Sequence, residues 1–536
     1  MPAERPSLGF VSPTVSIPRP VLRAALRVRE SAWVLPGAVL VFAALLRFWR
    51  LDSPDSLVFD ELYYVRDAAS QLVHGFPTSW PEDLGSGLGA GELAQMSADA
   101  SNAVHPPLGK WLIGLGMLVF GSDTGWGWRA AVALAGTLTV AVTMLIAHRL
   151  FARVTITALA GFLLAIDGVN IVLSRVGLLD GLLALFTTLG AYFFLLDHFW
   201  LRSRWRAWAL TPAGRARRGA GPVFWWRPWL LAGAVTLGLS ASIKWSGLYF
   251  LAAFLLLAVA SDLIVRARLR VPRWAVGGVL AQAPATGLVA LPAALVAYLV
   301  TWVGWVVTSG GWLRQWAAEH PATGVGALVP DWARSLWQYH LDMYGWHSTL
   351  QAPHPYSSHP LTWPLGLRPT SMYYLGSDSG ENGCLVERCS AAITPIPNVL
   401  LLWGGLLAIL ALSAWLVYRA VVGGTQHRLT LAAGFIVTGY AAGLLPWLLT
   451  PSRSAVFQFY TVVLTPFLAL ALAAAVWWFL RPRPGRGPQD HRMRVIAVAI
   501  FVVAAAVVSG YFLPLWLGTQ TSFEFWSLHM WLPGWR

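Results

Sequence analysis

The sequence predicts an all-α membrane protein whose chain crosses the bilayer many times. Of its 536 residues, 57% are hydrophobic and 12% are charged, whereas soluble domains are roughly 45–50% apolar and about 25% charged. Several apolar runs reach about 18–25 residues, a length that spans the hydrocarbon layer as a helix. The loops between these runs are unequal in charge, since some are rich in arginine and others in acids, which indicates a chain with two distinct membrane sides.

The order of elements starts with a tail. Residues 1–30 contain Pro and Arg and lack a cleavable signal pattern, so we expect them to be a cytoplasmic N-terminal tail. A membrane domain is expected over 31–518, followed by an outer tail at 519–536. The candidate spans within that domain are 33–50, 128–148, 154–174, 177–197, 229–246, 247–265, 282–308, 397–418, 429–449, 456–480 and 495–517.

A further apolar run, Trp111–Phe120, is too short to span, because ten residues of helix cover roughly 15 Å. If it does not cross, every arginine-rich loop falls on the cytoplasmic side and the two large acid-richer loops, 51–127 and 309–396, fall outside. If it crosses, all later loops invert. We therefore expect eleven crossings, a short interfacial helix at 111–120 and other short amphipathic helices in the outer loops, with the C-terminus outside.

The net charge of +14 is explained by the same excess of arginine in the loops predicted to be cytoplasmic. The segment 198–228 holds seven arginines and no acid, whereas 51–110 holds nine acids and two bases. An excess of arginine in cytoplasmic loops is the usual pattern of membrane proteins. No nucleic-acid partner is needed to account for it, and membrane lipids are the expected surroundings.

Ionisable side chains on the predicted outer side are the candidate functional residues, because such groups are costly near a bilayer and usually have a partner or a function. An acid pair follows the first span in the stretch FDELYY, and cations stand at the outer ends of several spans. The set is Asp60, Glu61, His105, Lys110, Arg129, Arg175, Asp180, Lys244, His354 and Arg453.

These residue types suit transfer of a group from a membrane-anchored phosphate. Arginine grips phosphate bidentately and lysine acts as a point charge, while a carboxylate takes the proton of an incoming hydroxyl. Taken singly, an acid pair after a helix is more often solvated, and a cation at a helix end is more often an interface anchor. Their shared sidedness favours a site.

Two further features fall on the outer side. Cys384 and Cys389 in CLVERC lie where the milieu is oxidising, so a local disulfide is predicted, with two unpaired thiols as the alternative. Carboxylates beside a phosphate are also suitable ligands for Mg²⁺ or Mn²⁺. The cations of the set provide the same charge, so we expect no metal or other cofactor, and a divalent cation is the alternative.

Six motifs in chain order resemble those of the protein O-mannosyltransferase family, a group of membrane glycosyltransferases with the GT-C fold, and in particular its actinobacterial members. They run in order along most of the chain, and the run of six is much more specific than any one of them. The motifs are FDE (59–61), HPPLGKW (105–111), WRAAVALAGTLTV (128–140), LSRVGLLD (173–180), SIKWSGLY (242–249) and HPYSSHPLTWPL (354–365).

The resemblance implies a polyprenyl-phosphate mannose donor, Ser or Thr hydroxyls of exported proteins as acceptors, inversion at the sugar, and eleven spans in the cell membrane with the site on the outer face. By motif, Asp60 is the expected base and Glu61 assists acceptor or sugar binding. Arg129 and Arg175 are similar to family arginines, and Asp180 to a family aspartate. The chain's only lysines, Lys110 and Lys244, both lie in family motifs, which favours substrate contact.

One departure and two alternatives remain. Eukaryotic members carry a β-trefoil domain in a large lumenal loop, whereas 309–396 has no β-trefoil pattern. Acceptor selection must therefore differ or depend on a partner, for which the Sec translocon is a candidate. A related GT-C transferase acting on a lipid or cell-wall glycan is the alternative enzyme. A transporter is the remote alternative, because charges gather at one face and no repeat is visible.

Overall fold

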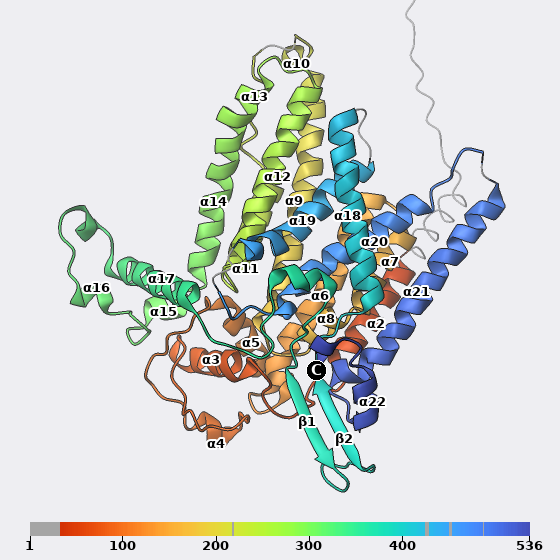
Figure 1. The fold of residues 1–536 in the computed structure, drawn as a ribbon. Coiled ribbons are helices and arrows are strands. Elements are labelled where there is room, and N and C mark those ends of the chain that lie inside the picture. The colour runs from red at the N-terminus through yellow and green to blue at the C-terminus, as the bar shows by residue number, and fades with distance from the viewer. Residues whose placement is uncertain (1–32, 217–218, 424–427, 450–452, 486) are drawn as a thin grey trace, which may run out of the picture.

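The structure is a computed structural model that describes residues 33–216, 219–423, 428–449, 453–485 and 487–536. The predicted tail at 1–30 lies outside the described residues. Most of the described chain is helical, and the long helices lie side by side as a bundle (Figure 1). Helices α6, α9 and α20 are buried along most of their length and form the centre of the bundle.

Each predicted span coincides with a helix or with consecutive helices. Eight of the described helices, some with short adjoining segments, are long and apolar enough to cross a membrane. The number of crossings stays a prediction. The helices are α2 (Val34–Phe48), α6 (Gly125–Phe151), α7 (Val154–Ala165), α8 (Gly168–Leu173), α9 (Leu179–Ala209), α11 (Pro228–Ala241), α12 (Gly247–Arg268), α13 (Trp274–Val276), η1 (Gly277–Gln282), α14 (Ala283–Val300), α15 (Val303–Val307), α18 (Val399–Val422), α19 (Arg428–Leu448), η4 (Gln458–Leu464), α20 (Thr465–Phe479) and α21 (Pro488–Leu517).

The third predicted span, 154–174, is not one helix. The chain breaks after α7, and Asp167 caps α8 by accepting a hydrogen bond from the backbone N–H of Asn170 at 2.8 Å. The side chain of Asn170 in turn accepts one from the buried Arg47 of α2 at 2.6 Å. Such a break is tolerated at membrane depth where side chains satisfy the freed backbone groups inside the protein.

The short apolar run forms α5 (Leu108–Phe120), which packs lengthwise against α6. Its 13 residues cover about 20 Å, less than the hydrocarbon thickness. Two glycines permit the close approach, since a Cβ on Gly116 would lie 2.4 Å from the Gly127 carbonyl oxygen, and one on Gly127 would lie 1.7 Å from that of Gly121. The other end of α5 lies beside Leu179 and Ile243, and the Leu108 N–H donates to the Ser242 carbonyl oxygen at 3.0 Å.

Shorter elements gather at the end of the bundle that carries α3 and α4, and to one side of it (Figure 1). Helix α17 projects sideways, and α10 lies at the opposite end. These elements are α3 (Glu61–His74), α4 (Ala90–Leu93), α10 (Pro212–Ala216), α16 (Trp316–Glu319), η2 (Gly324–Leu328), α17 (Asp331–Thr349), η3 (Pro360–Leu365), α22 (Phe523–Leu528) and η5 (Pro533–Trp535).

The loop 309–396 also contains strands that the sequence analysis did not predict. Strands β1 (Tyr373–Asp378) and β2 (Arg388–Ile393) form an antiparallel hairpin with Tyr373 opposite Ile393, and β3 (Thr521–Ser522) joins the other edge of β2. The predicted disulfide is confirmed, with Cys384 bonded to Cys389 at the hairpin. The hairpin thus ties the large loop to the C-terminal segment.

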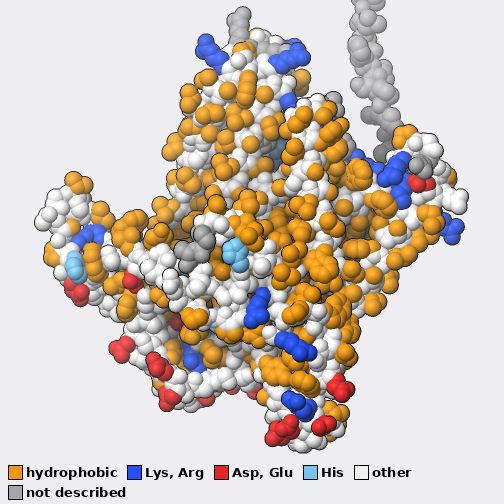
Figure 2. All heavy atoms as spheres, in the orientation of Figure 1, with side chains coloured by type: hydrophobic (Ala, Val, Ile, Leu, Met, Phe, Trp, Pro, Cys, Tyr) orange, Lys and Arg blue, Asp and Glu red, His pale blue; other side chains and the backbone are white. Residues whose placement is uncertain are grey.

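Charge separates along the bundle as the loops predicted. Lys and Arg side chains gather at the end that carries α10 and α13, and some also lie near the β1–β2 hairpin, whereas Asp and Glu side chains are most numerous near α4 and that hairpin (Figure 2). We call these the basic end and the acidic end. The side chains that the sequence analysis singled out belong to elements near the acidic end.

Candidate active site

The two acids of FDELYY lie in different surroundings although they are adjacent. Phe59 has a φ of 49°, in the left-handed region, which costs a residue with a side chain roughly 1–3 kcal/mol. Packing of its ring against Phe457 and Phe459 fixes this turn. Helix α3 begins directly after Asp60, so the side chains of Asp60 and Glu61 diverge. Asp60 is partly exposed and Glu61 is fully buried.

Glu61 holds the outer loop to the bundle. Both of its carboxylate oxygens accept hydrogen bonds from Arg129 of α6, each at 2.8 Å. They also accept from the backbone N–H groups of Val58 at 2.9 Å and Gly177 at 2.6 Å. A bidentate pair of this kind is the strongest geometry for an arginine and a carboxylate. Its burial and these contacts place Glu61 in the scaffold, and its contact with the acceptor or the sugar stays a prediction.

Arg129 has no donor left for a ligand. Besides the two bonds to Glu61, it donates to the carbonyl oxygens of Leu51 at 3.1 Å, Pro54 at 2.9 Å and Ser56 at 2.8 Å. A guanidinium has five N–H donors, and all of them are used by protein groups. These contacts fix the segment that leads to the acid pair, and the phosphate contact of Arg129 stays a prediction.

Arg175, like Arg129, donates hydrogen bonds to backbone carbonyl oxygens. It is buried and donates to the carbonyl oxygens of Leu46, Arg47 and Arg50 at 3.1, 3.0 and 3.3 Å. These groups lie at the C-terminal end of α2, where carbonyls lack helical partners and cations are favourable. The structure does not bring Arg175 to the cavity described next.

A cavity of about 270 Å³ lies among those ends of α9, α12 and α19 that are nearer the acidic end, with α17 beside it. Its volume is near the lower end of ligand cavities, roughly 300–1,000 Å³. Polar and aromatic side chains form much of its wall. The lining residues are His105, Asp180, Leu183, Lys244, Trp245, Ser246, Tyr249, Phe250, Tyr344, His347, Ser348, Gly443, Trp447, Arg453, Tyr460 and Val463.

Lys244 and Asp180 form the central ion pair of this cavity. The ammonium of Lys244 donates to Asp180 at 2.7 Å and lies 4.9 Å from the centre of the Tyr460 ring. An ammonium has three N–H donors, so one bond to Asp180 leaves others available. Among the described residues, only some of the N–H donors of Lys244 therefore have an acceptor, whereas all five of Arg129 do.

The second cation of the cavity is Arg453. Its Nη1 lies 3.1 Å from Nδ1 of His347, whose Nε2 lies 2.7 Å from the Val104 carbonyl oxygen. This arrangement fits a neutral imidazole that donates from Nε2 and accepts at Nδ1. Burial, and then the charge of Arg453, lower the pKa of His347 to about 4. His347 therefore orients Arg453 without adding charge.

Asp60 lies close to Lys244 and Asp180 of this cavity, and among the described residues it forms no ion pair. Burial raises the pKa of Asp60 to about 6, while the charge of Lys244 and a hydrogen bond from Tyr64 oppose the rise and Asp180 adds to it. A carboxylate with a pKa near neutrality is well matched to take a proton at physiological pH. The two adjacent acids therefore occupy different places, since Asp60 lies beside the cavity and Glu61 is part of the scaffold.

The other predicted residues support the cavity wall. Lys110 is buried, pairs with Asp67 at 3.1 Å and donates to the His105 carbonyl oxygen at 3.0 Å, so it positions His105 and does not line the cavity. The His105 ring lies 5.2 Å from that of His347, and burial holds its pKa well below the usual value. His354 packs its ring against Phe457 at 5.0 Å.

Sequence reasoning missed the aromatic side chains of the site. Tyr64 follows Asp60 by four residues, and this helical spacing was a signal that pointed to contact. Tyr460 and Trp245 gave no such signal, because they meet Lys244 or His347 only through the tertiary fold. His347 stands in the same loop as His354 and was not separable from it by sequence.

The chemistry of the cavity suits an anion better than a metal ion. Lys244 and Arg453 supply two positive charges, and Asp180 is already paired with Lys244. Among the described residues, no three His, Cys, Asp or Glu side chains gather in a metal-binding group. The expectation that no metal is needed stays a prediction.

Comparison with known proteins finds family models and relatives that match this chain. Residues 37–308 match the family model described as dolichyl-phosphate-mannose-protein mannosyltransferase, and 332–535 match that of the C-terminal four-helix membrane region of protein O-mannosyltransferases. The chain is 31% identical to the polyprenol-phosphate-mannose–protein mannosyltransferase of Mycobacterium tuberculosis, over 99% of this chain and 97% of that one. It is equally identical to the Corynebacterium glutamicum protein of the same name, with 93% and 92% covered.

The fold has a solved counterpart. The structure of the Saccharomyces cerevisiae Pmt1–Pmt2 complex bound to the sugar donor aligns with a TM-score of 0.69 at 15% identity, and covers 94% of this chain and 93% of that one. The predicted GT-C architecture is thereby confirmed, and the chain is a multi-pass membrane protein. With matches that extend over nearly its whole length, the chain belongs to the dolichyl-phosphate-mannose–protein mannosyltransferase family.

Proposed function

We propose that this protein transfers mannose from a polyprenyl-phosphate mannose to Ser or Thr hydroxyls of exported proteins. The supporting observation is a carboxylate, Asp60, that forms no ion pair among the described residues and lies beside a cavity lined by two cations, Lys244 and Arg453. The curated relatives are named for the same donor class and for protein acceptors. Family membership also favours a transferase over the transporter considered above.

The reaction follows from the arrangement of charges. The donor phosphate lies between Lys244 and Arg453, and the mannose extends toward Asp60. Asp60 takes the proton of the acceptor hydroxyl while the hydroxyl oxygen forms a bond to the anomeric carbon. The bond from that carbon to the phosphate oxygen breaks, and its electrons stay on the phosphate. Fixed cations stabilise that developing charge best where it appears in the transition state.

One displacement inverts the sugar and needs no covalent enzyme intermediate. The scaffold residues contribute indirectly, because Glu61 and Arg129 fix the turn that presents Asp60. His347 holds Arg453 through its neutral imidazole. In this scheme no metal ion is required, since the two cations provide the charge that a divalent ion supplies elsewhere.

We also propose the orientation. The basic end faces the cytoplasm together with residues 1–30, and the acidic end, with the cavity and residues 519–536, faces outward at the cell membrane. The separation of charge in Figure 2 supports this assignment by the excess of arginine at one end. Exported chains then reach the cavity as they emerge, which makes the Sec translocon the candidate partner for acceptor delivery.

The test is mannose transfer in membranes from labelled polyprenyl-phosphate mannose to a Thr/Pro-rich peptide. Replacing Asp60 by Asn should lower turnover by about 10²–10⁴-fold, the usual contribution of a general base, at normal protein yield. The matched control is Asp55→Asn, which changes an exposed acid of the same loop and should leave the rate unchanged. A wild-type rate in Asp60→Asn would overturn the base assignment.

Acceptor class is tested in the same membranes. Label should appear in the peptide as an alkali-releasable α-mannoside. Label that enters only lipid-extractable or cell-wall glycan material would instead establish the related transferase that acts on such acceptors.

A further inference from the structure

A second cavity, of about 220 Å³, lies near the basic end between α9, α12 and α19. It shares no lining residue with the outer cavity. Its wall is largely apolar and includes Phe194, Leu201, Phe254, Leu257, Ile264 and Phe435. A slot of this kind suits a hydrocarbon chain, but lipid tails are as apolar as the slot itself, so apolar contact alone gives little preference among lipids.

Arginines at the edge of this cavity supply a basis for preference. Arg202 and Arg268 line both the slot and an adjoining open depression, which also contains Arg206. Among the described residues, none of these three arginines forms an ion pair or donates a side-chain hydrogen bond. The depression therefore presents three positive charges that no described carboxylate neutralises.

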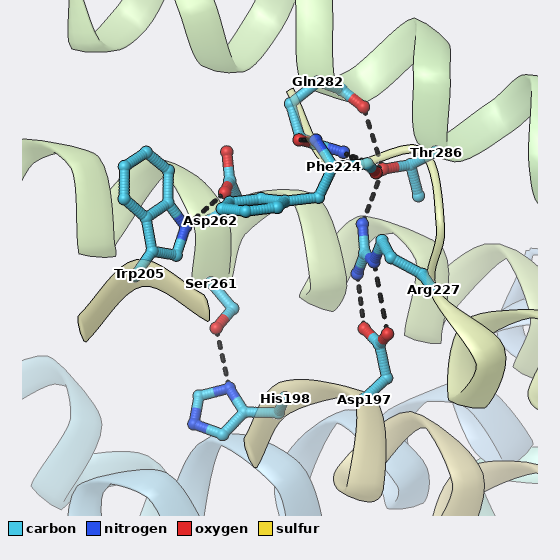
Figure 3. Close-up of polar contacts among 9 residues, drawn as sticks. All are labelled: Asp197, His198, Trp205, Phe224, Arg227, Ser261, Asp262, Gln282 and Thr286. Atoms are coloured by element: carbon cyan, nitrogen blue, oxygen red, sulfur yellow. Dashed lines mark hydrogen bonds and ion pairs between the residues drawn. The ribbon is translucent and has the colours of Figure 1, made fainter. Parts of the chain in front are cut away.

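Neighbouring arginines behave differently. Arg227 donates to both oxygens of Asp197, and Arg266 donates to Asp262 at 2.5 Å. Figure 3 shows the first pair together with Thr286, which accepts a further bond from Arg227 at 2.8 Å. The acids near this end are thus used inside the bundle, and the charge at the edge of the slot is available to an external anion.

A polar atom on the wall of the slot is also without a partner. Nδ1 of His198 lies 2.7 Å from the Ser261 hydroxyl oxygen (Figure 3), while its buried Nε2 has no hydrogen-bond partner among the described residues. Both side chains line the slot. A buried ring nitrogen without a partner is unfavourable, which points to a ligand with an ester or hydroxyl oxygen at this position.

We propose that this second cavity is a binding site for an anionic phospholipid of the leaflet at the basic end. One acyl chain fills the slot, the phosphate lies on Arg202, Arg206 and Arg268, and an oxygen near the glycerol meets His198. Arginine binds phosphate oxygens in a planar, bidentate manner, and cations beside a membrane favour anionic headgroups. The donor's phosphate belongs to the other end of the bundle under the proposed function, so the two sites take different lipids.

The experiment uses the full-length protein, delipidated in detergent and measured by native mass spectrometry. Phosphatidylglycerol should bind at least tenfold more tightly than phosphatidylcholine with the same acyl chains. The double variant Arg202→Gln/Arg268→Gln should bring that ratio close to one. The matched control is Arg204→Gln on the same helix, because Arg204 lies over the Trp200 ring and lines neither depression; it should keep the wild-type ratio.

Two further measurements on the wild-type protein distinguish binding of the intact phospholipid from binding of its headgroup alone. Glycerophosphoglycerol, the headgroup without tails, should not bind at concentrations where phosphatidylglycerol saturates. A phosphatidylglycerol with a photoreactive acyl chain should label peptides of α9, α12 or α19 that line the slot, and excess phosphatidylglycerol should prevent this labelling.

The proposal is overturned by equal affinity for the two phospholipids, by an equal loss in Arg204→Gln, or by labelling elsewhere. It is also overturned if polyprenyl phosphate displaces phosphatidylglycerol at equal concentration, because the slot would then belong to the donor's tail.

Discussion

Two groups of buried or half-buried cations lie near the acidic end of this molecule, and they differ in what their donors contact. Arg129 and Arg175 donate to Glu61 and to backbone carbonyls around the end of α2. Lys244 and Arg453 line a cavity, and among the described residues Lys244 pairs with Asp180 and Arg453 with His347. The difference teaches that charge and sidedness identify a functional region, while the number of occupied donors decides which cations can act on a ligand.

Breaking the first group should cost stability. In Arg129→Met the buried Glu61 loses its partner, which costs roughly 3–5 kcal/mol for pairs of this kind. We expect a large fall in the yield of folded protein and in its thermal midpoint in detergent. The folded fraction that remains should keep its KM for the donor. A normal midpoint with a raised donor KM would instead assign Arg129 to the phosphate.

Breaking the second group should cost catalysis. Lys244→Met removes a cation from the leaving phosphate and should lower kcat about 10²–10³-fold, as loss of one oxyanion contact does. The control is Lys244→Met/Asp180→Asn, which removes both charges of the pair. This double variant should regain the thermal midpoint but not the rate. Recovery of the rate would show that Lys244 acts through packing alone.

The sequence predicts the long helices and the types of residue at the site, but not the features that depend on partners distant in the chain. Backbone groups in lipid must be satisfied within helices, so long apolar runs located the long helices with little ambiguity, while the number of crossings stays a prediction. The break at Asp167 and the β1–β2 hairpin escaped prediction, because a single cap and two short strands in a polar loop depend on partners distant in the chain. For the site, residue type and sidedness brought forward Asp60 and Lys244, which the structure places close to one another.

What sequence could not show is which donors are already occupied. Arg129 is saturated by Glu61 together with carbonyl oxygens between Leu51 and Ser56, and a motif carries no record of backbone acceptors. The two acids of FDELYY are equivalent by sequence. They are separated only by the left-handed turn at Phe59 and by the N–H of Gly177, which lies far along the chain.

The pH dependence of the reaction sharpens the comparison between Asp60 and Glu61. A base must be deprotonated to act, and the pKa of Asp60 is about 6. The logarithm of kcat/KM should therefore fall by one unit per pH unit below about pH 6 and level off above it. The residual activity of Asp60→Asn should lack this limb. Because Lys244 lowers the pKa of Asp60, Lys244→Met should shift the limb to higher pH. An acid limb that persists in Asp60→Asn would point to another base.

The smallest effect is expected at Arg453, where the phosphate contact is shared with Lys244. Arg453→Gln keeps a donor near Nδ1 of His347 but removes the charge, and we expect the donor KM to rise about tenfold, roughly 1.4 kcal/mol, with a smaller change in kcat. Arg453→Lys should recover most of the affinity if charge is the main contribution, and little of it if the planar guanidinium is required. The measurement is the donor KM at fixed peptide concentration, with Arg334→Gln as the control, because Arg334 pairs with Asp331 away from the cavity. An unchanged donor KM in Arg453→Gln would leave Lys244 as the sole phosphate ligand and confine the comparison to a single cation.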